Sequence, residues 1–107
     1  MTGPEPVAAH PVPVTVLDAG MVADAVAAVT LAVPGVTALH TGAFGEVATY
    51  LPGRKVGGIR LADDVCEVHV AVLMGVDVLA VAEAVRRVVV PLVGTPLHVY
   101  VEDVTAG

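Results

Sequence analysis

The chain has 107 residues, a length that fits one domain with a single core. It is 56% hydrophobic and only 3% aromatic, and its net charge of −6 argues against a general binder of nucleic acids or anionic membranes, which both require a positive surface. Its single cysteine, Cys66, excludes an intrachain disulfide and any multi-cysteine metal site.

Apolar residues are in surplus, which predicts uncovered apolar surface for a partner or for self-association. The uncharged stretches 25–39 and 88–101 are interrupted by proline and glycine, so neither provides the run of about 20 apolar residues that a transmembrane helix needs. The first residues lack the basic start and apolar core of a signal peptide. We therefore expect a cytoplasmic protein without direct membrane insertion.

The first third of the chain predicts a tail, a short strand and a helix. Residues 1–13 contain four prolines and predict a flexible tail ahead of a single domain over residues 14–107. Residues 14–17 alternate and predict an edge strand, and Asp18 is expected to cap a helix over residues 21–32. Its core stripe is expected to be Val22, Val26, Val29 and Val33, with Asp24 and Thr30 facing outward.

The middle of the chain is the most distinctive stretch, because it contains the only phenylalanine and three of the five basic residues. Residues 36–40 predict a strand, and the glycines that follow break regular structure. Residues 44–51 are expected to form one or two helical turns that bring Phe44, Val47 and Tyr50 together. A turn at residues 51–54 and a strand over residues 59–61 follow.

The last third predicts a strand, a helix and a strand. Residues 65–74 alternate, with Cys66, Val68, Val70 and Val72 on the core face and Glu67 and His69 on the other. Asp77 is expected to cap a helix over residues 78–90, with the stripe Val78, Val81, Val85 and Val88 buried. Residues 97–104 alternate again, with Leu97, Val99 and Val101 inward and His98, Tyr100 and Glu102 outward.

A strand, a crossover helix and a strand in succession favour a parallel pair with the usual right-handed connection. The order β-α-β-β-β-α-β then predicts an α+β fold. We expect a two-layer sandwich in which two helices pack on one face of a small mixed β-sheet.

The candidate contact residues lie in the middle stretch. Aromatic and arginine side chains are common anchors at protein interfaces. We expect Phe44 and Tyr50 to anchor a partner, and Arg54, Lys55 and Arg60 to orient an acidic one. The alternative is that the apolar side chains of this stretch only cover an open end of the core.

The sequence offers no catalytic constellation. It contains no serine, and Cys66 is expected on an apolar face, so no activated nucleophile is evident. The glycines lack the pattern of a phosphate-binding loop. We expect no enzyme activity and no cofactor.

Two binding functions remain as alternatives. His40, His69 and His98 lie on or at the end of predicted strands and would form a metal or small-ligand site if those strands are neighbours. A weaker alternative is an RNA-binding module with Tyr100, Arg54, Lys55 and Arg60 exposed on a small sheet, although no RNA-binding motif is present and the charge opposes it.

Five segments of the chain resemble the alkaline shock protein family, also called the envelope stress response family, in its actinobacterial form. They are the helix end at Val33-Pro-Gly-Val36, the loop from Leu39 to Arg54, the strand start Val56-Gly-Gly-Ile-Arg60, the strand from Val65 to Val72, and the terminal stretch from Val99 to Val104. With the first helix, which closes on the first of these segments, the resemblance extends over about residues 14–104.

The resemblance implies a small cytoplasmic protein without catalytic activity that takes part in cell-envelope stress and homeostasis. It further implies self-assembly into a homo-oligomer, or attachment to the inner face of the membrane through a separate anchor protein.

Overall fold

The computed structural model of the chain describes residues 16–94 and 96–106, so the predicted tail over residues 1–13 lies outside the described residues. The elements are α2 (Val16–Leu31), β1 (Val36–Leu39), β2 (Ala48–Leu51), β3 (Arg54–Gly57), β4 (Ile59–Leu61), β5 (Cys66–Leu73), α3 (Val78–Val89), the short 3-10 helix η1 (Val90–Leu92) and β6 (Leu97–Thr105). Neither described α-helix is long and apolar enough to span a membrane.

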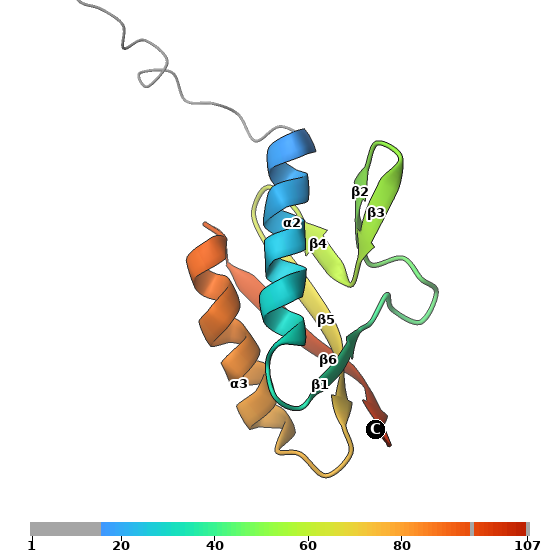
Figure 1. Ribbon diagram of the computed structural model, residues 1–107, viewed down its shortest axis with the longest axis vertical. Helices are drawn as coiled ribbons and strands as arrows, with labels where there is room; N and C mark the ends of the chain where they lie inside the picture. Colours follow the sequence, from blue (N-terminus) through green and yellow to red (C-terminus); the bar gives the residue numbers. More distant parts are fainter. Residues whose placement is uncertain (1–15, 95, 107) are drawn as a thin grey trace, which may run out of the picture.

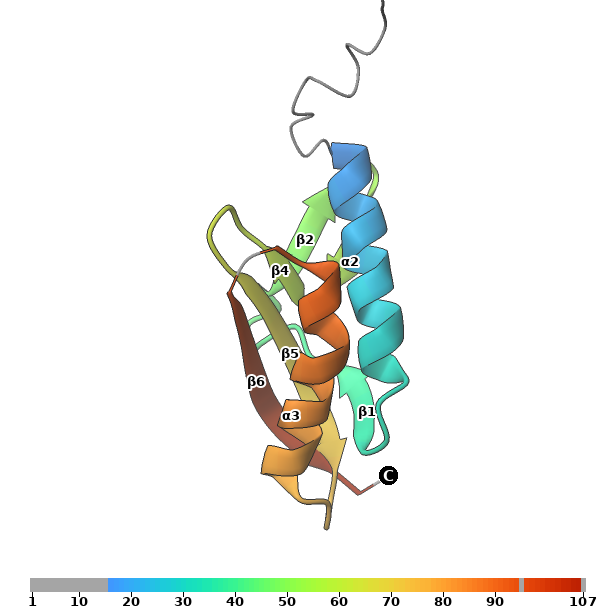
Figure 2. The ribbon, with the colours of Figure 1, turned by 90° about the vertical axis from the view of Figure 1, so that its left-hand side faces the viewer.

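The main sheet is built around β5, and the two α-helices cover one of its faces (Figures 1 and 2). β6 runs parallel to β5 on one side, while β1 and β4 run antiparallel to it on the other. The predicted α+β fold, with two helices on a small mixed sheet, is confirmed, and so is the parallel β5/β6 pair joined by a crossover helix.

β1 and β4 together form a single sheet edge that is interrupted by an excursion of the chain. β1 pairs with the second half of β5 and β4 with the first half. At the break, the N–H of His40 donates to the carbonyl of His69 at 2.8 Å, and the N–H of His69 donates to the carbonyl of Gly58 at 2.9 Å. Residues 41–57, here called the arm, leave and return at this point and contain the hairpin of β2 and β3.

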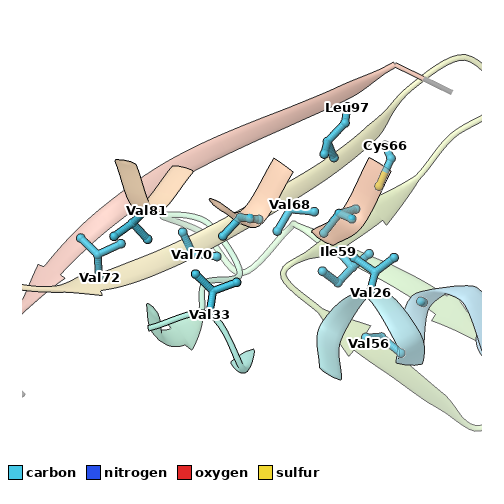
Figure 3. Close-up of a cluster of buried hydrophobic side chains, with 13 residues drawn as sticks. Val26, Val33, Val56, Ile59, Cys66, Val68, Val70, Val72, Val81 and Leu97 are labelled. Atoms are coloured by element: carbon cyan, nitrogen blue, oxygen red, sulfur yellow. The ribbon is translucent and has the colours of Figure 1, made fainter. Parts of the chain in front are cut away.

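Local signals explain why the two helices form where they do. Asp77 caps α3, because its carboxylate accepts the N–H of Ala80 at 3.1 Å, as predicted. α2 ends ahead of Pro34 and of Gly35, which has a φ of +97°. Both helices bury valines against the core face of β5, where Cys66, Val68, Val70 and Val72 are fully buried as predicted (Figure 3).

The strand predicted over residues 14–17 is wrong where the structure describes it, because Val16 and Leu17 belong to α2. A four-residue alternation fits a helix as well as a strand. A helix satisfies its backbone groups internally, whereas a strand here would need a neighbour in the sheet. Asp18 consequently lies within the helix and not at its cap.

The buried faces of the helices are rotated relative to the prediction. In α2 the buried positions include Val26 and also Thr30, which was expected to face outward. In α3 the buried stripe is Val81, Val85 and Val89, whereas the expected members Val78 and Val88 are 40% and 37% exposed. Valine and alanine occupy most positions of both helices, so composition alone does not identify the face that packs on the sheet.

The helical turns predicted over residues 44–51 are also wrong, because residues 48–51 form β2. Gly45 has a φ of +74°, which a right-handed helix does not allow. β2 pairs with β3 through a two-residue turn, as the predicted turn at residues 51–54 requires. Phe44, Val47 and Tyr50 therefore do not form a cluster: Val47 is buried, and the two aromatic side chains are exposed.

Candidate functional site

The charged, aromatic and histidine side chains that could take part in binding gather in two places. One is the arm, residues 41–57, which projects from the split sheet edge (Figure 1). The other is the face of the sheet turned away from the helices, here called the open face, which carries Arg60, Glu67, His69, His98, Tyr100 and Glu102.

The loop at the start of the arm is fixed by its own hydrogen bonds. The N–H of Gly42 donates to Nδ1 of His40 at 2.9 Å, and the N–H of Phe44 donates to the Glu46 carboxylate at 3.0 Å. The pKa of Glu46 is lowered, first by the bond from its own backbone N–H and then by that from Phe44. This ordered loop leaves the side chain of Phe44 93% exposed.

The hairpin of the arm is attached to the body of the protein at its base. The hydroxyl of Thr49 donates to the carbonyl of Ile59 at 2.6 Å, and the N–H of Gly58 donates to the carbonyl of Val47 at 2.8 Å. At the other end Gly20 of α2 permits close approach: a Cβ there would lie 3.2 Å from atoms of the Leu51 and Arg54 side chains. The arm is therefore held against the rest of the protein both at its base and at α2.

The predicted contact residues of the hairpin have different surroundings. The Arg54 guanidinium forms two hydrogen bonds, of 3.1 and 3.0 Å, with the Asp24 carboxylate of α2, and this carboxylate raises the pKa of Arg54. Lys55 lies opposite Tyr50, with its ammonium nitrogen 5.9 Å from the ring centre. Tyr50 is 66% exposed, so the hairpin presents an aromatic ring beside a positive charge, while Arg54 is engaged within the chain.

Arg60 lies apart from the other four predicted contact residues. It belongs to β4, opposite Glu67 of β5, and is half-buried. Because neighbouring residues of a strand point to opposite faces, Arg60 lies on the open face while Ile59 is fully buried in the core. The five residues thus divide among the loop, the hairpin and the sheet.

His69 is the centre of a compact cluster on the open face. Its Nε2 lies 3.0 Å from a Glu67 carboxylate oxygen, and its Nδ1 contacts the Glu102 carboxylate. The Tyr100 ring stacks on the imidazole with a centroid distance of 4.4 Å. His69 lies on the strand face opposite the core, as predicted, but these neighbours leave it only 6% exposed.

The two carboxylates and the Tyr100 ring hold the His69 side chain in place. A neutral imidazole has one N–H and donates to one carboxylate, whereas a ring protonated on both nitrogens donates to Glu67 and Glu102 together. In both states each ring nitrogen lies against a carboxylate oxygen, but only the doubly protonated ring donates to both. The sequence placed Glu67 and His69 on one face, but finding Glu102 and Tyr100 beside them required the pairing register of β5 with β6.

The three histidines do not converge as a metal site would require. His40 accepts the Gly42 N–H, His69 is engaged by two carboxylates, and His98 is exposed and lies edge-on to Tyr100. The described part of the chain contains no group of three or more histidine, cysteine or acidic side chains arranged to bind a metal ion.

Cys66 is fully buried in the core, and burial raises the pKa of its thiol from 9.0 to about 11, with a smaller contribution from the Glu67 charge. The thiol therefore stays protonated and shielded at neutral pH.

Two shallow hollows open over the helix layer, and both are apolar. One, of about 330 Å³, lies between α2 and α3; the other, of about 170 Å³, lies beside η1. They are lined respectively by Val29, Ala32, Val33, Pro34, Ala84, Arg87 and Val88, and by Ala19, Val22, Leu61, Ala62, Leu92, Val93 and Gly94. Neither contains the aromatic residues of the arm or a member of the His69 cluster.

No family model, no curated protein and no solved structure matches this chain.

Proposed function

We propose that the chain is a non-enzymatic interaction protein of the envelope-stress type, which acts in the cytoplasm and reaches the inner face of the membrane through a partner protein. In this proposal the arm is the contact surface for that partner. The resemblance to the alkaline shock protein family suggests the role, and the geometry of the arm suggests the surface.

The exposure of Phe44 is the observation that carries the proposal. Its ring is 93% exposed, although it belongs to a loop fixed by side-chain and backbone hydrogen bonds. Because the backbone of this loop is already ordered, binding through the ring requires little further ordering of the loop. Aromatic residues, phenylalanine included, are enriched in the cores of protein interfaces.

The hairpin supplies a second anchor with a charge beside it. Tyr50 is 66% exposed next to Lys55, and this positive charge favours an acidic partner surface. Arg54 contributes indirectly, since its bonds to Asp24 fix the hairpin against α2.

A photo-crosslinking amino acid at position 44 tests the proposal in cells. We expect a specific covalent adduct, identified by mass spectrometry, that becomes several-fold weaker when Tyr50→Ala is added. The matched control carries the crosslinker in place of Met74, which is 64% exposed on the turn before α3. Identical adducts at both positions, or no adduct at position 44 with or without envelope stress, would refute the arm as contact surface.

A further inference from the structure

β6 is an edge strand with one unpaired side. It lies at the outer edge of the sheet (Figure 2), and among the strands of residues 16–94 and 96–106 it pairs only with β5. With nine residues it exceeds the typical strand of about 5–6 residues. A long unpaired edge presents free backbone N–H and C=O groups to another strand.

The parallel ladder determines which backbone groups of β6 are free. Cys66 pairs with Leu97, and its N–H donates to the carbonyl of Pro96 at 2.8 Å. In a parallel ladder, alternate residues direct their backbone groups to opposite sides of the strand. His98 and Tyr100 therefore bond to β5, whereas Leu97, Val99 and Val101 direct their N–H and C=O groups toward the unpaired side.

The free stretch is limited at its C-terminal end. The register shifts after Val101, and beyond the shift the N–H of Val104 donates to the carboxylate of Asp103 at 2.8 Å. Residues 97–101 remain, and we call them the β6 edge.

One side chain already reaches the β6 edge. The Arg86 guanidinium donates to the carbonyl of Leu97 at 2.7 Å. A carbonyl oxygen has two lone pairs, so this contact leaves room for a second donor.

We propose that the β6 edge pairs with the same segment of a second copy of the chain, antiparallel and centred on Val99. This inference rests on the proposed function, since it names one partner of an interaction protein. In this register Val99 faces Val99 of the second copy, and Leu97 faces Val101 of the second copy. These are the residues with free backbone groups, so each facing pair exchanges two hydrogen bonds.

The side chains fit the same register. His98 faces Tyr100 of the second copy, which makes two symmetric aromatic contacts across the axis. Glu102 and Asp103 fall outside the paired segment, so like charges do not face each other there. The result is one continuous sheet through both copies, with all four α-helices on the same face.

The first test is the molar mass of the full-length chain by sedimentation equilibrium from 10 µM to 1 mM. We expect a reversible dimer, and we expect Val99→Pro to raise its dissociation constant at least about tenfold, because the two copies lose two hydrogen bonds. The Val99 N–H does not bond to β5, so this proline leaves the internal ladder intact. Circular dichroism checks that the variant folds.

Val104→Pro is the matched control in the same strand. Its N–H also faces the unpaired side, but Asp103 already occupies it, so we expect an unchanged dissociation constant. A wild-type chain that is strictly monomeric up to 1 mM, or a dimer that Val99→Pro does not weaken, would overturn the proposal.

A second test fixes the register without any proline. His98→Cys and Tyr100→Cys chains are mixed and oxidised; Cys66 does not compete because it is fully buried. Facing Cα atoms lie about 4.5 Å apart and diagonal ones about 7–8 Å, so we expect the 98-to-100 disulfide to form at least about tenfold faster than the 98-to-98 disulfide. Absence of this preference contradicts the register.

The outcomes separate this inference from the proposed function. A dimer that survives Val99→Pro but is lost with Phe44→Ala assigns self-association to the arm and overturns the pairing of β6. A dimer sensitive to Val99→Pro, together with no adduct at position 44, supports the pairing and refutes the arm as contact surface.

Discussion

Replacing Thr30 with valine should stabilise the protein. Thr30 lies in α2 with no exposed surface, and its hydroxyl oxygen has no hydrogen-bond partner in the structure. Burying an unpaired polar group costs about 1–3 kcal/mol. Valine has nearly the same shape and a similar helix propensity, so the substitution removes this cost without leaving a cavity.

We expect Thr30→Val to raise the free energy of unfolding by about 1–2 kcal/mol, measured by urea denaturation. The melting temperature should rise by roughly 4–8 °C for each kcal/mol in a domain of this size. Thr30→Ser is the control: it keeps the hydroxyl, loses a buried methyl group and should destabilise by about 1 kcal/mol.

An unchanged or lower free energy of unfolding for Thr30→Val would refute the reasoning. It would show that the hydroxyl is bonded in solution, either to a buried water molecule or to a backbone carbonyl of the preceding turn of α2.

Three further predictions concern backbone geometry, charge and the core thiol. In urea denaturation, Gly58→Ala should lower the free energy of unfolding by about 2–5 kcal/mol, and Gly53→Ala by only about 1–2 kcal/mol. Both glycines have a positive φ, but only at Gly58 would the new Cβ meet a neighbour, the Cβ of Leu39 at 2.8 Å. Arg54→Ala should weaken the fold slightly, and its difference from wild type should vanish in 1 M salt, because the pair with Asp24 is half exposed. Cys66 should resist Ellman's reagent at pH 8 until the chain is unfolded. Its pKa rises from 9.0 to about 11 on folding, so the unfolded chain loses the thiol proton first, and stability should fall between pH 9 and 11 more steeply than in Cys66→Ala. Equal slopes for the two proteins would contradict this.

The parts of the fold that were predicted correctly are those with strong local signals. The alternation of residues 66–72 places four side chains in the core, and Asp77 marks the start of α3. A strand, a helix and a strand in succession are nearly always joined by a right-handed crossover, which makes the parallel β5/β6 pair predictable.

The errors arise where local signals are weak or where distant residues decide. α2 is apolar on most sides, so the burial of Thr30 depends on how the helix packs on the sheet. The strand β2 depends on its partner β3, which no four-residue pattern in residues 44–51 reveals. The burial of His69 depends on Tyr100 and Glu102, about 30 positions along the chain.

The candidate site was predicted only in outline. Phe44, Tyr50 and Lys55 are accessible, whereas Arg54 already bonds to Asp24 and Arg60 lies on the open face. Their roles in binding stay predictions, because accessibility is a condition for contact and does not identify a partner.

The interrupted sheet edge determines which parts of the chain can vary in sequence without disturbing the sheet. His40 and Gly58 both bond to the backbone of His69, so the register of the sheet is determined by residues on either side of the arm. The loop before β2 and the turn at Pro52 and Gly53 can therefore vary in length and sequence while β5 keeps its neighbours. New binding specificities could therefore arise through changes in these two tips while the sheet and the helices keep their structure.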